Sequence, residues 1–187
     1  MAESALPEQS FFGGLGLFTA SGVPKAAYYA LTLLSRLGDE LLDRGEGWFV
    51  TRQAGEYRIM LCNYRHFSRL YAHGERFDMT FTDRYTPFSP EQALDVHLCL
   101  NNVPDGDYTV RETIVNRRWG SAFDKWVEMG AVEPDTPEEL QTLAALSVPM
   151  RSRYLARAEN KSLQIDALLD PLELRLITLT PAPRRSP

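Results

Sequence analysis

Segment 81–88, FTDRYTPF, holds the side chains of this chain that are best placed for binding chemistry. Aromatic residues alternate there with charged ones, so that Asp83, Arg84 and Tyr85 follow one another in the least regular part of the sequence. Loops of this kind carry binding residues more often than regular elements do. We therefore predict 81–88 as a functional loop, with these three residues as candidate substrate-binding residues.

Other acidic residues lie near this loop in the sequence, at Glu75 and Asp78, and Glu128 closely follows Trp126. Acidic side chains in polar loops are usually solvated. We therefore expect none of them to form a catalytic pair with Asp83, and we predict no catalytic residue in this chain.

Cysteines and histidines show no pattern of a metal site. Cys62 and Cys99 lie in the strand-like runs RIMLCNY and DVHLCLN, which predicts two buried free thiols, with a disulfide as the alternative. His66, His73 and His97 are scattered, and neither cysteine has the spacing of a zinc ligand. We expect no metal and no cofactor.

The composition limits the class of protein. The chain has 187 residues, of which 44% are hydrophobic and 11% aromatic, enough for a real core. Its net charge of −5 argues against a nucleic-acid partner, which favours a basic surface. No apolar run approaches the ~20 residues that span a membrane, and the first ten residues lack the basic and apolar regions of a signal peptide. We expect a cytoplasmic protein without a membrane partner.

The N-terminal part predicts one strand and one helix. Residues 14–19, GLGLFT, form a short apolar run, and SGVP then turns the chain. Pro24 suits the first helical turn, where its missing N–H costs nothing, and Gly38 suits the C′ position that ends a helix. Between them apolar residues recur at helical spacing, at Ala27, Ala30, Leu31, Leu34 and Leu37.

From about residue 39 the period of the apolar residues changes to two, which predicts short antiparallel strands. In 57–62, Tyr57, Ile59 and Leu61 share one face. The turn signal VPDGDY predicts a hairpin between 94–102 and 108–116. Strands are also predicted at 151–160, 161–170 and 172–181, and the last puts Glu173 and Arg175 on the face opposite its leucines.

Two short helices, at 121–130 and 136–147, interrupt the strands, and Thr136 is predicted to cap the second. Seven or eight short strands with turns between them indicate a sandwich. The predicted fold class is mainly β: an antiparallel β-sandwich with an N-terminal strand–helix unit and two short inserted helices.

Two stretches carry a resemblance to a known family. FFGGLGLFTASGVPKAAYYALTLLSRLGDELL, at 11–42, resembles the stretch that closes the catalytic barrel in glycoside hydrolase family 39, the β-xylosidase family. There a Phe-x-Gly-Gly-x-Gly-Leu strand precedes a Gly-x-x-Lys-x-Ala-Tyr-Tyr helix. NRRWGSAFDKWVEMGAVEPDTPEELQTL is similar to that family's segment of an aromatic, a Trp, Met-Gly and a short acidic helix. The resemblance extends to PLELRLITLTP and is weakest over 64–92.

The resemblance implies a division of the chain. Family members carry a (β/α)8 barrel followed by a β-sandwich, and a complete barrel takes ~250 residues. Residues 11–38 would then be the last strand–helix unit of a barrel, and 39–181 a β-sandwich accessory domain. Residues 1–10 would be a disordered leader and 182–187 a tail. The missing catalytic barrel would be the partner, while contacts between copies and binding of a xylo-oligosaccharide stay open.

The resemblance also implies the chemistry of a retaining glycosidase, which needs two carboxylates ~5–5.5 Å apart. In the family both lie on earlier barrel strands, the acid/base in an Asn-Glu-Pro context that this sequence lacks. We therefore expect this chain alone to be inactive. Glu3 lies roughly where family members can place a carboxylate that hydrogen-bonds the sugar, and Phe12 stands where many have His. Both are candidate substrate-binding residues.

The tryptophans and the loop aromatics leave two interpretations open. They form either a platform on which a sugar ring stacks, or the core and the seam between barrel and sandwich, which we favour. The residues concerned are Trp48, Trp119, Trp126, Tyr64, Tyr71, Tyr85 and Phe88.

Three functions follow from these interpretations. The first is a non-catalytic C-terminal β-sandwich of a β-xylosidase-like enzyme, whose parent hydrolyses xylosides with retention and whose barrel the sandwich braces. The second is an autonomous carbohydrate-binding module that uses surface aromatics. The third is an independent hydrolase with the acidic loop as its site. The sequence favours the first.

Overall fold

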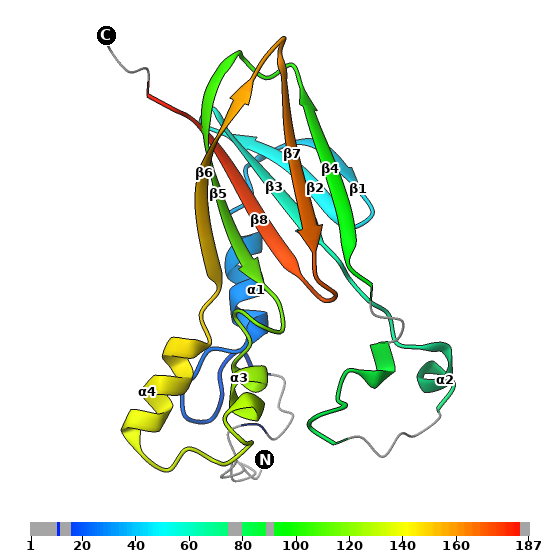
Figure 1. The fold of residues 1–187 in the computed structure, drawn as a ribbon, viewed down its shortest axis with the longest axis vertical. Helices are drawn as coiled ribbons and strands as arrows, with labels where there is room; N and C mark the ends of the chain where they lie inside the picture. Colours follow the sequence, from blue (N-terminus) through cyan, green and yellow to red (C-terminus); the bar gives the residue numbers. More distant parts are fainter. Residues whose placement is uncertain (1–10, 12–15, 75–79, 89–91, 184–187) are drawn as a thin grey trace, which may run out of the picture.

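A computed structural model describes residues 11, 16–74, 80–88 and 92–183 of the protein (Figure 1). Its strands are β1 Glu40–Gly45, β2 Trp48–Gln53, β3 Glu56–Cys62, β4 Leu94–Asn101, β5 Gly106–Val115, β6 Met150–Ala158, β7 Ser162–Leu169 and β8 Leu174–Pro181. Its helices are α1 Ala26–Leu34, α2 Arg69–Ala72, α3 Ala122–Glu128 and α4 Pro137–Leu146, with a 3₁₀ turn, η1, at Thr86–Phe88.

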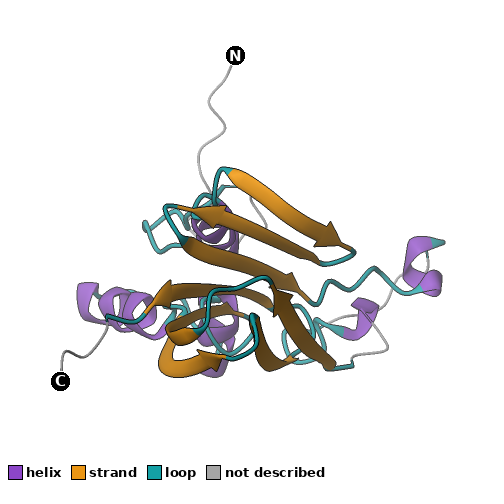
Figure 2. Cartoon of the chain, turned by 90° about the horizontal axis from the view of Figure 1, so that it is seen from above, coloured by secondary structure: helices purple, strands orange, loops and turns teal. Residues whose placement is uncertain are grey.

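Two antiparallel sheets lie face to face (Figure 2). The larger sheet has the strand order β1–β2–β3–β8–β5–β6, and β4 and β7 form the smaller one. The helices α3 and α4 lie beyond one end of the strands (Figure 1). The predicted fold class, a mainly β antiparallel sandwich with an N-terminal helix and two short inserted helices, is confirmed.

The strands β1, β2 and β3 form a meander because tight turns join them. Ala54 and Gly55, between β2 and β3, have φ angles of 50° and 81°. Two successive positive φ angles define the type I′ turn, whose twist matches that of the flanking strands. The glycine-containing turns predicted after residue 39 are therefore confirmed here.

The main hydrophobic core lies between the two sheets. Tyr57, Ile59 and Leu61 of β3 all belong to it, as the alternation predicts. The smaller sheet contributes mainly through the inner side of β7, with Leu163, Ile165, Ala167 and Leu169.

A second apolar layer lies on the outer face of the larger sheet, under α1. Leu33 of α1 is 2% exposed and packs with Met60 of β3, Val115 of β5 and Leu176 of β8. The strand β3 is therefore buried on both faces at this level, and α1 is held by the sheet through its own small core.

The hairpin predicted between 94–102 and 108–116 is wrong. β4 pairs with β7, whereas β5 pairs with β6 and β8, so the intervening loop carries the chain from one sheet to the other. In that loop Asn102 has a φ of 61° and Val103 is 1% exposed, because its side chain enters the main core. Turn residues reverse the chain, but they do not choose the partner of the strand that follows.

The strand predicted at 14–19 is not formed by its described residues, 16–19; residues 14 and 15 lie outside the described residues. Phe18 makes one isolated antiparallel bridge to Pro24, and Thr19 N–H donates to the carbonyl of Val23 at 2.9 Å. The segment thus folds back on itself instead of pairing with a sheet. Pro24 accordingly precedes the helix, whose N-cap is Lys25, and does not lie in its first turn.

Gly38 does not end α1, because the C-cap is Ser35. Gly38 instead approaches β2: a Cβ there would lie 2.5 Å from the carbonyl oxygen of Arg52, and its N–H donates to Thr51 Oγ1 at 2.8 Å. Close approach to the β2 backbone, rather than helix termination, explains the glycine.

The two inserted helices are confirmed, and both begin at capping side chains. Ser121 Oγ accepts from the N–H of Asp124 at 3.3 Å, and Thr136 Oγ1 accepts from the N–H of Glu139 at 3.2 Å. A third apolar cluster joins α3 and α4 to the N-terminal segment through Val23, Ala122, Trp126 and Leu143.

Both cysteines are free, as predicted. Cys62 is half-buried, and this burial raises the pKa of its thiol. The prediction that Cys99 is buried is wrong, since it alternates with the inward-facing Leu98 and Leu100 on β4 and points to the outer, exposed side.

Candidate functional site

Asp124 of α3 is the centre of a polar cluster that includes two of the predicted site residues. Its carboxylate is 2% exposed and accepts hydrogen bonds from Arg84 Nε at 3.1 Å and from the Tyr85 hydroxyl at 2.7 Å. Arg84 Nη2 and Ser121 Oγ donate to the same carboxylate. Loop 80–88 is thereby attached to the first turn of α3.

The electrostatics of this cluster favour the ion pair. Burial lowers the pKa of Arg84, but the hydrogen bond and charge of Asp124 raise it by more, so its guanidinium stays charged. Burial, and then the hydrogen bond to the Asp124 carboxylate, raises the pKa of Tyr85. The guanidinium of Arg117 lies 4.0 Å from the centre of the Tyr85 ring. The side chains of this cluster bind one another, so their hydrogen-bonding groups are directed into the cluster.

Asp83 does not join this cluster. Its carboxylate accepts from the N–H of Thr80 at 2.5 Å and from the Thr80 hydroxyl at 2.7 Å, and these bonds lower its pKa. Asp83 thus closes a local turn on the exposed side of the loop. Glu3 and Phe12 lie outside the described residues, as do Glu75 and Asp78.

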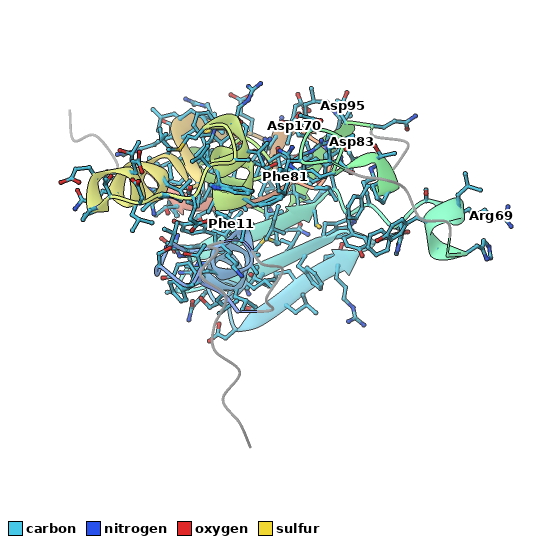
Figure 3. The ribbon with its side chains drawn as sticks, turned by 90° about the horizontal axis from the view of Figure 1, so that it is seen from below. Phe11, Arg69, Phe81, Asp83, Asp95 and Asp170 are labelled. Atoms are coloured by element: carbon cyan, nitrogen blue, oxygen red, sulfur yellow. The ribbon has the colours of Figure 1, made fainter. Side chains whose placement is uncertain are left out.

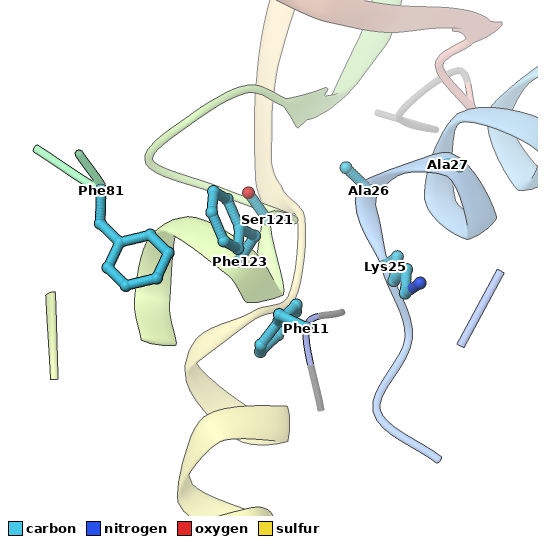
Figure 4. A pocket seen from close by; sticks show the side chains of 7 residues that line it. All are labelled: Phe11, Lys25, Ala26, Ala27, Phe81, Ser121 and Phe123. Atoms are coloured by element: carbon cyan, nitrogen blue, oxygen red, sulfur yellow. The ribbon is translucent and has the colours of Figure 1, made fainter. Parts of the chain in front are cut away.

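A cavity of about 450 Å³ lies between the start of α1, α3 and loop 80–88 (Figure 4). Phe11, Phe81 and Phe123 form its aromatic walls, and Ser121 connects it to the Asp124 cluster. The rest of its lining comes from Lys25, Ala26 and Ala27. An apolar cavity with aromatic walls can take an apolar or aromatic group, or the apolar face of a sugar ring. The described residues that line it include no carboxylate.

Most aromatic rings near this cavity pack on one another and do not form a flat platform. The ring of Trp126 lies 5.1 Å from Phe11 and 5.1 Å, edge-on, from Phe81, and its indole N–H donates to the carbonyl of Val132 at 2.8 Å. Figure 3 labels the two phenylalanines. Trp48 is half-buried against the main core. The interpretation as core is therefore confirmed for these two tryptophans, whereas Trp119 is 38% exposed.

A buried polar network at one end of the sandwich was missed from the sequence. Arg175 is paired with Glu173 at 2.6 Å and lies 3.7 Å from Glu112, and it also donates to the carbonyl of Leu168 on β7 at 2.8 Å. Asn116 donates to Glu173 at 3.0 Å. The alternation in 172–176 correctly placed Glu173 and Arg175 on the face opposite the leucines. It did not predict that this polar face points inward, toward the other sheet.

The acidic residues of this network are not arranged for hydrolysis. Asp170 and Glu173 both accept from the amide of Asn116, at 3.2 and 3.0 Å, so the two carboxylates are close together. Glu173 is 2% exposed and neutralised by Arg175, which joins the sheets. Neither carboxylate lines the cavity of Figure 4.

Asp124 was likewise missed as the anchor of the loop. Its sequence signal is the spacing Ser121-x-x-Asp124, which predicts a helix N-terminus and nothing more. Within the described ranges no group of three His, Cys, Asp or Glu residues is arranged to hold a metal ion, and no helix there is long and apolar enough to cross a membrane.

Known proteins resemble this chain in both sequence and fold. No protein-family model matches the chain. The β-xylosidase of Geobacillus stearothermophilus is 25% identical over 178 residues, which are 95% of this chain and 31% of that protein. The chain resembles the family 39 β-xylosidases. The resemblance predicted from 11–42 and 116–143 is thereby confirmed, and this chain spans about a third of that β-xylosidase and of the solved GH39 and β-xylosidase structures that it matches.

Solved structures also show the resemblance to β-xylosidases. A GH39 enzyme from Xanthomonas axonopodis pv. citri matches with a TM-score of 0.74 at 18% identity, over 94% of this chain and 34% of that one. A monomeric β-xylosidase from Caulobacter crescentus CB15 also matches with a TM-score of 0.74, at 23% identity over 95% of this chain and 35% of that one. At these identities the structures show a shared fold.

A second kind of relative is also similar to this β-xylosidase-like chain. An uncharacterized HTH-type transcriptional regulator of Staphylococcus aureus strain N315 is 19% identical over 147 residues, which are 79% of this chain and 18% of that protein.

Proposed function

We propose that this chain is a non-catalytic β-sandwich part of a β-xylosidase-like enzyme and that it braces a (β/α)8 barrel. The observation that carries the proposal is the sequence match of 95% of the chain to 31% of a β-xylosidase. The cavity beside α1 supports it, since none of its described lining residues carries a carboxylate. The parent enzyme would hydrolyse xylosides with retention, by carboxylates that the barrel supplies.

The helix α1 provides the surface for this role. One side of it packs on the larger sheet through Leu33, whereas Leu31 and Leu34 are 52% and 42% exposed. A helix of a (β/α)8 barrel lies against parallel strands, and the described part of the chain places no such strand beside α1. Exposed leucines on an ordered helix suit an apolar partner surface.

The similarity to HTH-type regulators supports a non-catalytic role. The same chain resembles parts of proteins described as a β-xylosidase and as transcriptional regulators. A region that occurs in proteins of such different description is better explained as a structural or binding unit than as the site of one reaction.

The test is complementation. The chain would be co-expressed with the Geobacillus stearothermophilus β-xylosidase from which the matching third has been removed. We expect the two to co-purify and to restore hydrolysis of an aryl β-xyloside, while this chain alone gives no turnover. Leu31→Arg should abolish co-purification. Leu155→Arg, at a leucine that is 66% exposed on β6, is the matched control. Turnover by the chain alone, or complementation that Leu31→Arg leaves unchanged, would contradict the proposal.

A carbohydrate-binding module remains the second candidate, favoured by exposed rings in segment 63–73. Tyr64 and Phe67 are 65% and 53% exposed, and Phe67 lies 4.9 Å from Tyr71 and from Phe88. Titration calorimetry with xylotetraose would detect binding that Phe67→Ala removes. Absence of heat at millimolar sugar would exclude this candidate.

A further inference from the structure

The outer face of β5 and β6 carries a row of arginines beyond the part that α1 covers. Tyr108 and Val110 of β5 belong to the main core. Because side chains alternate along a strand, Arg111 points to the opposite, outer side. In the register of the sheet Arg111 is directly opposite Arg153 of β6, and Arg151 is opposite Thr113. We call Arg111, Arg151 and Arg153 the arginine face.

This arrangement costs stability and is neutralised locally only at Arg111, whose charge helps to lower the pKa of Glu56. Like charges directly opposite each other on neighbouring strands are destabilising. All three arginines are exposed, and in the described part of the chain neither Arg151 nor Arg153 has an ion pair. Arg111 donates to Thr180 Oγ1 at 3.1 Å, a neutral partner. The chain as a whole has a net charge of −5, so this cluster of positive charge is opposite in sign to the rest of the protein. The cluster does not stabilise the fold.

The nearby acidic residues have other partners. Glu56 of β3 is paired with Arg58 at 3.0 Å and accepts from Thr180 at 2.9 Å. Asp107, at the start of β5, lies 3.7 Å from Arg157. The positive charges of Arg151 and Arg153 are therefore available to a ligand.

A cavity of about 780 Å³ adjoins the arginine face. Arg153, Thr109 and Leu155 line it, so a guanidinium, a hydroxyl and an apolar side chain lie together; its other lining residues are Gly106, Asp107, Ala182 and Pro183. Thr113, Thr178 and Thr180 lie on the same outer side of β5 and β8, next to the arginines in register. The surface thus combines cations with hydroxyl groups.

We propose that the arginine face and its adjoining cavity bind a carboxylated oligosaccharide. Guanidinium groups bind carboxylates through two parallel hydrogen bonds, and threonine hydroxyls suit the hydroxyls of a sugar chain. A nucleic acid fits less well, because no aromatic side chain for base stacking lies among the outward residues of β5 and β6. The proposal does not depend on the proposed function.

Titration calorimetry of the full chain with tetragalacturonate tests this proposal, with neutral xylotetraose as the matched sugar and oligothymidylate as a phosphate polyanion. We expect tetragalacturonate to bind, and to bind more weakly as salt rises from about 50 to about 200 mM, and xylotetraose not to bind at this face. Arg111→Gln and Arg153→Gln should each raise Kd about tenfold, as loss of a charge-assisted bidentate contact does. Arg44→Gln, on β1 at the far edge of the sheet, should leave Kd within about twofold.

Folding of the variants is checked by thermal unfolding. Since Arg153→Gln relieves a like-charge pair, its Tm should equal or exceed that of the parent. Absence of tetragalacturonate binding would overturn the proposal. So would binding that both face variants leave unchanged, or tighter binding of oligothymidylate that is lost in the same variants.

Discussion

Asp124 shows how one buried carboxylate can organise a segment that the sequence leaves irregular. Its oxygens accept hydrogen bonds from Arg84, Tyr85 and Ser121, so loop 80–88 and the start of α3 depend on one charge. Arg84 and Tyr85 are predicted from the sequence as substrate-binding residues, and the contacts that the structure gives them are structural. Whether either also contacts a sugar stays a prediction.

Asp124→Asn is expected to destabilise the protein by about 2–4 kcal/mol, because it removes one partner of a largely buried ion pair and leaves the other charge behind. Urea unfolding followed by circular dichroism measures this change. Asp83→Asn, at an exposed carboxylate with only local partners, should change the free energy of unfolding by less than about 0.5 kcal/mol. Equal losses in the two variants would refute the role given to Asp124.

At the scale of the elements, the close contact between the α1–β1 connection and β2 depends on Gly38. Apolar spacing correctly predicted a helix before this glycine, and glycine is common after helices. The structure assigns it another role, since the residue lies against the backbone of Arg52 and its N–H donates to Thr51. A pattern that identifies an element does not identify what its ends contact.

Gly38→Ala is expected to cost about 1–3 kcal/mol, because the added Cβ would overlap a carbonyl oxygen that belongs to a sheet and cannot move freely. Chemical denaturation provides the measurement. Gly16→Ala is the control, since its Cβ would meet the nearest atom at an ordinary 3.5 Å. A Gly38→Ala protein as stable as the parent would show that the connection can shift.

At the scale of the whole molecule, the N-terminal helix is both part of the sandwich and open to a partner. Leu33 fixes α1 to the sheet, while Leu31 and Leu34 face outward. The division into a barrel remnant, 11–38, and a sandwich domain, 39–181, stays a prediction. In the structure α1 shares a hydrophobic core with β3, β5 and β8.

Leu33→Ala should therefore lower the free energy of unfolding by about 2–5 kcal/mol, in a single transition shared by helix and sheet signals. Leu31→Ala, at a position 52% exposed, should cost less than about 1 kcal/mol. Two separate transitions for Leu33→Ala would mean that α1 and the sandwich are independent units.

The sequence by itself determined many of the elements: the alternation in 57–62, the helical spacing in 27–37, the cap at Thr136, and the family resemblance. These signals are local, since each depends on residues a few positions apart. Only the tertiary structure decided that β4 pairs with β7, that Glu173 and Arg175 face inward, that Asp124 anchors loop 80–88 and that the arginines of β5 and β6 lie side by side. Such pairings join residues that are far apart in the chain, and their free energy depends on burial and charge that exist only once the sheets have packed.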